Sequence, residues 1–375
     1  MFVRVLFAGG GTAGHITPAL AIAGYLREKQ PDAEILFIGN RGGMEEKLVP
    51  KAGFAMKTIV ISGFQRKMTP KAIAHNVKTL TRVVTSSHQA RRIIRDFAPD
   101  LCVGTGGYVS GPVVRTAMKL GIPAVIHEQN AYPGVTNKML SADAARVMMA
   151  VSDAEKYMKP GARCVLTGNP IRPEILREER AAARKKLGVD DRPLILSFGG
   201  SLGARRVNEV VADLCAWEQH EHKPVLHLHA TGQYGVQLFE QLQKQKDFAP
   251  GDSLVVKEYI NNMPELLAAA DLVISRAGAL TLAELEAVGR AAVLIPSPNV
   301  AENHQYYNAM ELQKAGAAVV IEEKDLTGEK LVQTVSAMLA QPGKLAEMGK
   351  NARSLSVDDS LDRITAALLK LVKTP

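Results

Sequence analysis

The chain is short of cysteine and of aromatic residues, and both shortages exclude classes of protein. Its 375 residues include 3 cysteines and 1 tryptophan, and aromatic residues make up 5% of the total. Cys102, Cys164 and Cys215 are scattered, form no CxxC motif and have no histidine partner at the spacing of a metal site. We therefore expect a reduced compartment, and neither a disulfide framework nor a zinc site.

The sequence also lacks a hydrophobic run that suits a membrane span. Residues 5–26 contain no Asp, Glu, Lys or Arg, but several glycines, His15 and Pro18 interrupt them. We interpret this stretch as a buried strand, a loop and a helix. With 46% hydrophobic and 22% charged residues, the chain has the composition of a folded globular protein, and its length favours two domains.

Acidic residues are missing from one long segment. Between Lys47 and Arg95 there are eleven lysines and arginines and no aspartate or glutamate, in a chain whose net charge is +8. Such a segment is usually a solvated face, but it also suits an anionic membrane or an anionic lipid substrate. Nucleic acid is a weaker interpretation, because no aromatic residues interleave with the basic ones as stacking platforms.

Short apolar runs that end in glycine or polar residues alternate with helical patterns along the chain. Strands that alternate with helices are typical of βαβ units and parallel sheets. The predicted fold class is therefore α/β, with two doubly wound parallel-sheet domains of the Rossmann type. The predicted strands are 3–8, 33–38, 58–61, 101–103, 124–127, 146–150 and 164–166 in the first half, and 194–198, 225–229, 254–257, 272–275, 292–295 and 318–321 in the second.

The domain boundary is predicted within "GNPIRPEILREER", residues 168–180. Pro170 and Pro173 interrupt the pattern there, and a charged helix follows. An amphipathic helix at about 360–373 ends the chain and could pack on either domain. In such folds ligands sit beyond the carboxyl ends of the strands, so the loops that follow strands are the places to search for a site.

The first such loop, in "AGGGTAGHITPALAIA", matches the Gly-x-Gly-x-x-Gly pattern of dinucleotide-binding enzymes. That interpretation requires an acid after the second strand to hold a ribose, but Gly39, Asn40 and Arg41 follow it instead. The loop can still approach any phosphate closely, because glycine has no side chain and a helix N-terminus attracts anions. His15 would lie in the first turn of that helix. It is either a functional residue or, as is more usual for a single histidine, a side chain hydrogen-bonded to a backbone group.

Two more loops of the first half carry polar or glycine-rich sequences. "VGTGGYVSGP", residues 103–112, follows a strand and precedes a helix expected to start near Pro112; a tight turn alone seldom needs four glycines. "HEQNAYPGVTNK", residues 127–138, places Glu128 and Asn130 directly after a buried strand. These polar side chains either cap a helix or bind a ligand.

The second half repeats this arrangement. "SFGGSLGARRVNE", residues 197–209, is another strand, glycine loop and helix start. "SRAGALTLAEL", residues 275–285, places Glu284 one turn into a helix, where it could hold a ribose or form a capping box with Thr281. "PSPNVAENHQYYNA", residues 296–309, supplies further polar side chains after a strand. Phosphate-type loops on both domains suggest a nucleotide diphosphate between them.

Taken together, these stretches resemble those of the MurG-type enzymes, a family of GT-B glycosyltransferases that complete lipid II in bacterial peptidoglycan synthesis. The matching stretches are "GGGTAGHITPALA", "ISG", "GTGGYVSGP", "HEQNAYPGVTNK", "GNPIR", "GGSLGAR", "SRAGALTLAEL" and "HQYYNA". They occur in the family's order across nearly the whole chain. Two positions depart from the family pattern: Ala13 replaces the second glycine of many members, and His304 stands where some have glutamine.

The resemblance implies a GT-B fold, in which two Rossmann-like domains face a cleft. Residues 1–169 and 357–375 would form the N-terminal domain, which takes the lipid acceptor and associates with the membrane. The final helix would return to this domain. Residues 170–356 would form the C-terminal domain, which binds UDP-N-acetylglucosamine (UDP-GlcNAc).

The resemblance also assigns residues to the ligands. Glu284 would hold the ribose, the uracil would lie near Ile260, and Ser201 with its adjacent backbone would meet the diphosphate. The acceptor-side loop would contribute Gly106, Gly107, Tyr108 and Ser110. The residues carried over for UDP-GlcNAc binding are Thr12, Ala13, Gly14, Asn130, Arg172, Ser201, Ile260, Ala279, Leu280, Thr281, Leu282, Ala283, Glu284 and Gln305.

The implied reaction moves GlcNAc to the muramoyl 4-hydroxyl of undecaprenyl-diphospho-N-acetylmuramoyl-pentapeptide (lipid I), with inversion to a β-linkage. An alcohol is a weak nucleophile, so a base must take its proton. His15 is the first candidate, because a helix N-terminus favours a neutral imidazole, and Glu128 is the second. No acidic metal-binding motif follows a strand, so we expect no required metal or cofactor; a divalent cation would at most stimulate.

The implied partners are UDP-GlcNAc, lipid I and an anionic membrane surface, with no nucleic acid. The implied location is the cytoplasmic face of the bacterial plasma (inner) membrane, as a peripheral protein, and other cell-wall synthesis proteins are candidate partners. Two alternatives stay open: a related GT-B transferase that uses another lipid acceptor, and a nucleotide-sugar-binding scaffold without activity. A dehydrogenase is disfavoured by the missing acid after the second strand.

Overall fold

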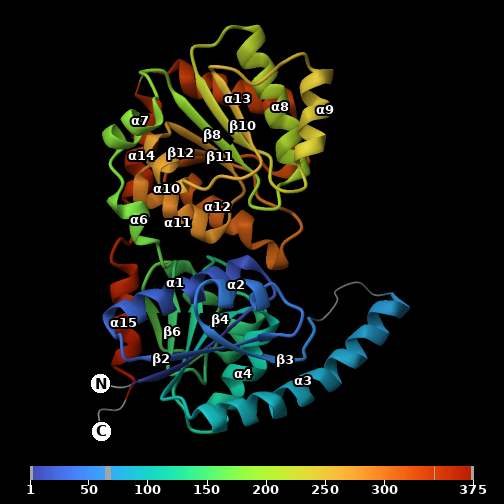
Figure 1. The fold of residues 1–375 in the computed structure, drawn as a ribbon, viewed down its shortest axis with the longest axis vertical. Coiled ribbons are helices and arrows are strands. Elements are labelled where there is room, and N and C mark those ends of the chain that lie inside the picture. The colour runs from blue at the N-terminus through green and yellow to red at the C-terminus, as the bar shows by residue number, and fades with distance from the viewer. Residues whose placement is uncertain (1–2, 64–68, 342, 373–375) are drawn as a thin grey trace. The chain divides into compact units, whose positions relative to one another are not determined.

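The chain folds into two compact α/β units (Figure 1). The computed structural model describes residues 3–63, 69–341 and 343–372. Unit 1 comprises residues 1–170 and 359–375, and unit 2 comprises residues 171–358. No helix among the described residues is both long and apolar enough to cross a bilayer.

Unit 1 is built on a seven-stranded sheet in the order β3-β2-β1-β4-β5-β6-β7, and every pairing in it is parallel. The central strands are apolar runs buried on both faces, as a parallel sheet covered by helices requires. The strands are β1 Arg4–Gly9, β2 Glu34–Asn40, β3 Ala55–Ile59, β4 Leu101–Gly106, β5 Ala124–Glu128, β6 Arg146–Met149 and β7 Cys164–Leu166.

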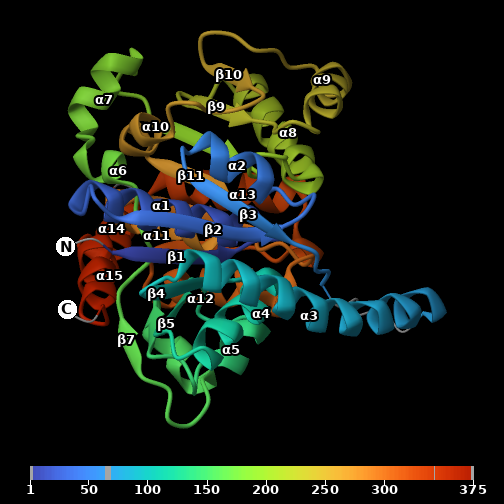
Figure 2. The same ribbon diagram turned by 60° about the horizontal axis from the view of Figure 1, so that its bottom comes forward.

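Two apolar cores cover the two faces of this sheet. One contains side chains of α3, α4 and α5, and the other contains side chains of α1 and α15. The last helix therefore belongs to unit 1: Leu361, Ile364 and Leu368 are buried in that core, and Tyr25 donates to Asp362 at 2.6 Å. Figure 2 shows α1 and α15 on unit 1 from a second side. The helices of unit 1 are α1 Ala13–Lys29, α2 Glu45–Lys51, α3 Pro70–Phe97, α4 Gly107–Lys119, α5 Val135–Leu140, the 3-10 helix η1 Ser152–Tyr157, and α15 Ser360–Leu369.

Unit 2 is built on a six-stranded parallel sheet in the order β10-β9-β8-β11-β12-β13. Its strands are β8 Leu194–Phe198, β9 Leu226–Ala230, β10 Leu254–Lys257, β11 Leu272–Ser275, β12 Ala291–Leu294 and β13 Ala318–Val320. Its helices are α6 Pro173–Arg177, α7 Arg180–Leu187, α8 Arg205–His220, α9 Val236–Gln245, α10 Met263–Ala269, α11 Ala279–Val288, η2 Ala301–Asn303, α12 His304–Lys314, η3 Glu323–Asp325, α13 Gly328–Ala340 and α14 Lys344–Arg353.

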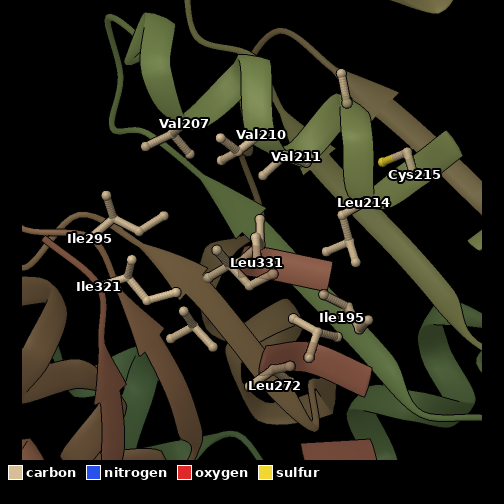
Figure 3. Packing of buried hydrophobic residues seen from close by; sticks show 14 of the residues in the cluster. Ile195, Val207, Val210, Val211, Leu214, Cys215, Leu272, Ile295, Ile321 and Leu331 are labelled. Atoms are coloured by element: carbon tan, nitrogen blue, oxygen red, sulfur yellow. The ribbon is translucent and has the colours of Figure 1, made fainter. Parts of the chain in front are cut away.

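The core on one face of this sheet lies between α8, α9, α13 and the strands (Figure 3). Val207, Val210, Val211 and Leu214 recur at helical spacing along α8 and are almost fully buried there. The opposite face is covered by α10, α11 and α12. The prediction of two doubly wound parallel-sheet domains is confirmed.

Candidate active site

The first loop of unit 1 places an imidazole against the glycines that follow β4. His15 lies in the first turn of α1, and its Nδ1 is 3.0 Å from Thr12 Oγ1. A methyl group added to Gly106 would come within 2.8 Å of the His15 ring, and one added to Gly107 within 3.2 Å of its Nδ1. The two loops, although 90 residues apart, thus meet at His15; the Thr105 hydroxyl also donates to the His15 carbonyl at 2.7 Å.

Gly107 is required at its position for two reasons. Its φ of +78° is in the left-handed region, and a Cβ there would lie only 2.1 Å from the carbonyl oxygen of Gly10. Both conditions favour glycine, which has no side chain to clash. The helix that follows, α4, begins at Gly107 and not near Pro112 as the sequence predicted. The prediction was wrong because Pro112 lies inside the helix and not in its first turn, which is where proline is usually tolerated.

A carboxylate that the sequence reasoning did not identify supports the first loop from inside. Glu45 is fully buried at the start of α2, and its carboxylate accepts from the backbone N–H of Asn40 at 2.8 Å and of Gly11 at 3.4 Å. A Cβ on Gly10, Gly39 or Gly43 would collide with the Glu45 side chain, at 2.3–2.6 Å. The Gly11 N–H points toward Glu45, although 3.4 Å is long for a hydrogen bond.

Tyr108 and Ser110 lie in the same region of unit 1. The Tyr108 ring covers Gly11, since a Cβ there would approach it to 2.6 Å. Burial, and after it the charge of Glu45, raises the pKa of Tyr108. Ser110 is fully buried, and its hydroxyl oxygen has no hydrogen-bond partner. The sequence-predicted acceptor loop is therefore partly internal: Tyr108 is half-buried, whereas Ser110 faces the interior.

Glu128, the second candidate for the base, is held by four donors. Its Oε1 accepts from the backbone N–H of Asn130 at 3.0 Å and from the Asn130 amide at 2.9 Å. Its Oε2 accepts from Gly134 N–H at 3.0 Å and from the Asn137 amide at 2.9 Å. Burial raises the pKa of Glu128, and these four donors oppose that shift. A carboxylate with both oxygens engaged in this way is suited to fixing the loop 128–137.

Unit 2 contains a cavity of about 600 Å³ beyond the carboxyl ends of its strands. Its floor is the loop after β8 with the start of α8, and its wall is formed by the loops after β11 and β12. Gly203 has a φ of +85°, and a Cβ there would lie 2.3 Å from the carbonyl oxygen of Thr231. The cavity is lined by Phe198, Gly199, Gly200, Gly203, Ala204, Arg205, Arg206, Glu209, Arg276, Gly278, Thr281, Ser297, Asn299, Gln305 and Glu323.

Three arginines and two glutamates give this cavity a formal charge of 3 − 2 = +1. Arg205 and Arg206 both pair with Glu209, at 2.9 and 3.1 Å. Arg276 is largely buried and pairs with Glu323 at 2.5 Å. Arginine, glycine-loop N–H groups and a helix N-terminus are the groups that bind phosphates in proteins, so the cavity suits an anionic ligand.

Four of the fourteen donor residues implied by the resemblance, Thr12, Ala13, Gly14 and Asn130, lie in unit 1, and the other ten lie in unit 2. Thr281 and Gln305 line the cavity, and the Gln305 amide oxygen accepts from Ser297 N–H at 2.9 Å. Ile260, Leu282 and Ala283 have buried side chains in the core. Ser201 lies exposed in the glycine loop, and Ala279, Leu280 and Thr281 form the first turn of α11.

Glu284 and Arg172 form an ion pair. The Arg172 Nε lies 2.8 Å from Glu284 Oε1, and the Glu284 side chain is 14% exposed. Burial raises the pKa of Glu284, and Arg172 opposes the shift. Glu284 makes no capping box with Thr281, because the N-cap of α11 is Gly278. Of the two roles predicted for Glu284, the capping box is therefore absent, and the contact with a ribose stays a prediction.

Family models match both units. The glycosyltransferase family 28 N-terminal domain matches residues 5–149, and the glycosyltransferase family 28 C-terminal domain matches residues 194–364. The chain belongs to glycosyltransferase family 28.

Its relatives in this family align over almost its full length. A protein of Acetivibrio thermocellus, named UDP-N-acetylglucosamine–N-acetylmuramyl-(pentapeptide) pyrophosphoryl-undecaprenol N-acetylglucosamine transferase, is 44% identical over 99% of both chains. A Bacillus cereus protein of the same name, numbered 1, is 42% identical over 99% of this chain and 100% of its own. The crystal structure of Acinetobacter baumannii MurG matches with a TM-score of 0.78 at 30% identity, covering 98% of this chain and 99% of that one. The expected GT-B family membership is confirmed.

Several residues of this family 28 site were not identified from the sequence. Arg205 and Arg206 directly follow the "GGSLGA" loop, so their position at a helix start beside a phosphate-type loop was a usable signal. Arg276 likewise follows β11 directly. Glu45 left no such signal, because its partners Gly11 and Asn40 come from other elements.

Proposed function

We propose that this chain transfers GlcNAc from UDP-GlcNAc to lipid I, which yields lipid II for peptidoglycan synthesis. The observation that carries the proposal is the alignment with full-length relatives that bear the name of this reaction at 42–44% identity. The cavity of unit 2 supports it, because a nucleotide sugar carries the diphosphate for which arginines and a glycine loop are suited.

In unit 2, the donor diphosphate lies in the cavity against the loop Gly199–Gly203. The backbone N–H groups of this loop and the start of α8 stabilise the negative charge that develops on the departing UDP. Arg276 supplies a positive charge whose position is fixed by Glu323 and by the carbonyls of Ile295 and Pro296, both at 3.2 Å. A fixed charge requires little reorganisation during the reaction.

The ribose is held by Glu284, whose orientation depends on Arg172. Because Arg172 engages one carboxylate oxygen, the other oxygen remains for a ribose hydroxyl. Arg172 would then act on the donor through its contact with Glu284. Where the side chains of the other implied donor residues are buried, as at Leu282 and Ala283, these residues act through their backbone groups.

In unit 1, His15 takes the proton of the muramoyl 4-hydroxyl. As this proton leaves, the 4-oxygen forms its bond to the anomeric carbon of GlcNAc while the bond from that carbon to the UDP oxygen breaks, with inversion. His15 is placed by the Thr12 hydroxyl and by the glycines of the second loop, Gly106 and Gly107. Such a base contributes a factor of about 10²–10⁴. Glu128, with its four donors, keeps the neighbouring loop in place.

The reaction takes place at the cytoplasmic face of the plasma membrane, to which unit 1 binds peripherally. The acid-free segment 47–95 supplies positive charge for anionic lipids, each basic residue near the surface contributing about 1 kcal/mol. Part of this segment forms α3, on which Val84 is 59% exposed. Turnover requires no added metal or cofactor.

The test compares two acceptors and one pair of variants. With UDP-GlcNAc, lipid I should accept GlcNAc and diacylglycerol should not; the reverse result would favour the other lipid acceptor. His15→Ala should lower kcat by about 10²–10⁴ and leave the KM for UDP-GlcNAc nearly unchanged. The matched control is His220→Ala, which removes a surface imidazole of unit 2 whose Nε2 donates to the backbone carbonyl of Asp247 at 2.8 Å. Near-normal turnover of His15→Ala would exclude His15 as the base.

A further inference from the structure

A cluster of three metal-binding side chains lies inside unit 2, apart from the residues that line its cavity. Cys215 and Glu218 are one turn apart on α8, and His227 lies on the neighbouring strand β9. Their ligand atoms all lie within 4.8 Å of one another. His227 Nδ1 is 2.8 Å from Glu218 Oε2 and 3.7 Å from Cys215 Sγ. The three groups therefore point to one spot between helix and sheet.

The cluster is buried at the edge of an apolar core. Cys215 and His227 are almost completely buried, and Glu218 is 6% exposed. Figure 3 shows Cys215 in the row of α8 residues that includes Val211 and Leu214. A carboxylate placed in such a core pays a large desolvation cost unless its charge is compensated. A thiolate and a carboxylate together carry two negative charges, which a divalent cation neutralises.

The imidazole of His227 is oriented as that of a metal ligand. Its Nε2 lies 2.7 Å from Ser197 Oγ on β8, and this hydroxyl also lies 2.8 Å from Nδ1 of His229. Histidines that bind metals almost always use the second ring nitrogen in such a hydrogen bond, which fixes the ring. The Ser197 contact leaves Nδ1 of His227 directed at Cys215 and Glu218.

We propose that Cys215, Glu218 and His227 bind one Zn²⁺ ion. Thiolate, imidazole and carboxylate form a donor set that suits zinc, whereas Mg²⁺ and Ca²⁺ prefer oxygen ligands alone. A tetrahedral ion with a Zn–S bond of about 2.3 Å and a Zn–N bond of about 2.0–2.1 Å separates the two ligand atoms by about 3.6 Å. The Cys215–His227 distance of 3.7 Å matches this value.

Two features complete the site. The Glu218–His227 distance of 2.8 Å is shorter than a tetrahedral edge, so the carboxylate must rotate outward by about half an ångström to bind the ion. Glu218, at 6% exposed, is the least buried of the three ligands, so we place the ion's entry path and a water as fourth ligand on its side of the cluster. The spacing of Cys215, Glu218 and His227 matches no common zinc motif, which is why we expected no zinc site from the sequence.

The ion would join α8 to the sheet and, through Ser197, would support the end of β8. The glycine loop of the cavity begins two residues after Ser197. We assign the ion a structural role, because its three ligands are buried and none of them lines the cavity. This inference does not depend on the proposed reaction.

The test uses the full chain, freed of metal with a chelator and titrated with Co²⁺ as a spectroscopic substitute for Zn²⁺. Binding should produce a thiolate-to-cobalt charge-transfer band at one ion per chain, and Zn²⁺ should remove it. Cys215→Ser should abolish the band. Cys102→Ser is the matched control, since Cys102 is an equally buried thiol in unit 1 and its loss should leave the band unchanged.

A second measurement needs no variant. Trp217, the single tryptophan, lies on α8 between two of the ligands, so its fluorescence follows the unfolding of unit 2. Zn²⁺ at about 100 times its dissociation constant should raise the midpoint temperature of the thermal unfolding of unit 2 by roughly 5–10 °C. A wild-type chain with neither the band nor the zinc-dependent shift would show a hydrogen-bonded cluster only and overturn the proposal. If Cys215→Ser fails to fold, Glu218→Gln replaces it and should weaken the ion's binding at least tenfold.

Discussion

Replacing Glu45 by alanine should destabilise unit 1 and displace the first glycine loop. The carboxylate is fully buried and joins three segments: it accepts from Asn40 and Gly11, and glycines of all three segments pack against it. An alanine removes both acceptors and leaves the backbone N–H groups without their partner. It also leaves a cavity where the side chain lay.

The expected loss is about 2–4 kcal/mol. Leaving the partly buried Asn40 N–H unpaired costs about 1–3 kcal/mol, and the cavity adds about 1 kcal/mol. The contact with Gly11 is long at 3.4 Å and adds little. Glu45→Gln keeps the shape and one acceptor oxygen, so it should cost less than about 1.5 kcal/mol.

The assay is urea unfolding followed by far-ultraviolet circular dichroism and by Trp217 fluorescence. Circular dichroism reports both units, whereas Trp217 reports unit 2 and should keep its midpoint. The matched control is Glu46→Ala, which removes an exposed neighbour that accepts from Gly42 and should cost about 0.5 kcal/mol or less. If Glu45→Ala costs no more than Glu46→Ala, the first glycine loop does not depend on the buried carboxylate.

Three further changes have defined outcomes. Gly107→Ala should lower kcat at least tenfold and destabilise unit 1 by about 2 kcal/mol or more, because its positive φ and its approach to the Gly10 carbonyl exclude a Cβ; unchanged kinetics would refute this. Burial raises the pKa of Glu286 to about 8, so this carboxyl takes up a proton when the chain folds. The free energy of unfolding should therefore fall as the pH rises from about 4.5 to 8. Glu286→Gln should remove this pH dependence when unfolding is followed by Trp217 fluorescence. Burial lowers the pKa of His127 to about 4, so stability should be lost as pH falls from about 6.5 to 4; a His127→Gln variant with an unchanged acid limb in circular dichroism would contradict this.

The strands were largely predictable because burial on both faces makes them apolar runs. The edge strand β3 was the least accurate: residues 58–61 were predicted, whereas β3 spans Ala55–Ile59. Only Ile59 of this strand is fully buried, so its side chains alternate between solvent and interior and the apolar signal is weak. The last helix was placed correctly at its start, Ser360, but ends at Leu369 instead of about 373.

The parts of the site that are continuous loops could be predicted from the sequence. Contacts between residues far apart in the sequence could not. A glycine loop that follows a strand can be recognised from a few consecutive residues, and such loops line the cavity of unit 2. The Arg172–Glu284 pair joins residues 112 apart, and only the folded chain brings them to 2.8 Å. The same holds for Glu45 and Gly11. No periodicity or spacing encodes such a contact, because it depends on how separate elements pack.

The return of α15 to unit 1 has a consequence for the order in which the chain folds during synthesis. Unit 2 is one continuous segment, so it can complete its fold as soon as residue 358 has left the ribosome. Unit 1 is translated first but finished last, because the apolar surface of α1 awaits Leu361, Ile364 and Leu368. At about 5–20 residues per second, roughly 10–40 s pass between the two segments of unit 1. During that interval this surface is open to chaperones and to aggregation.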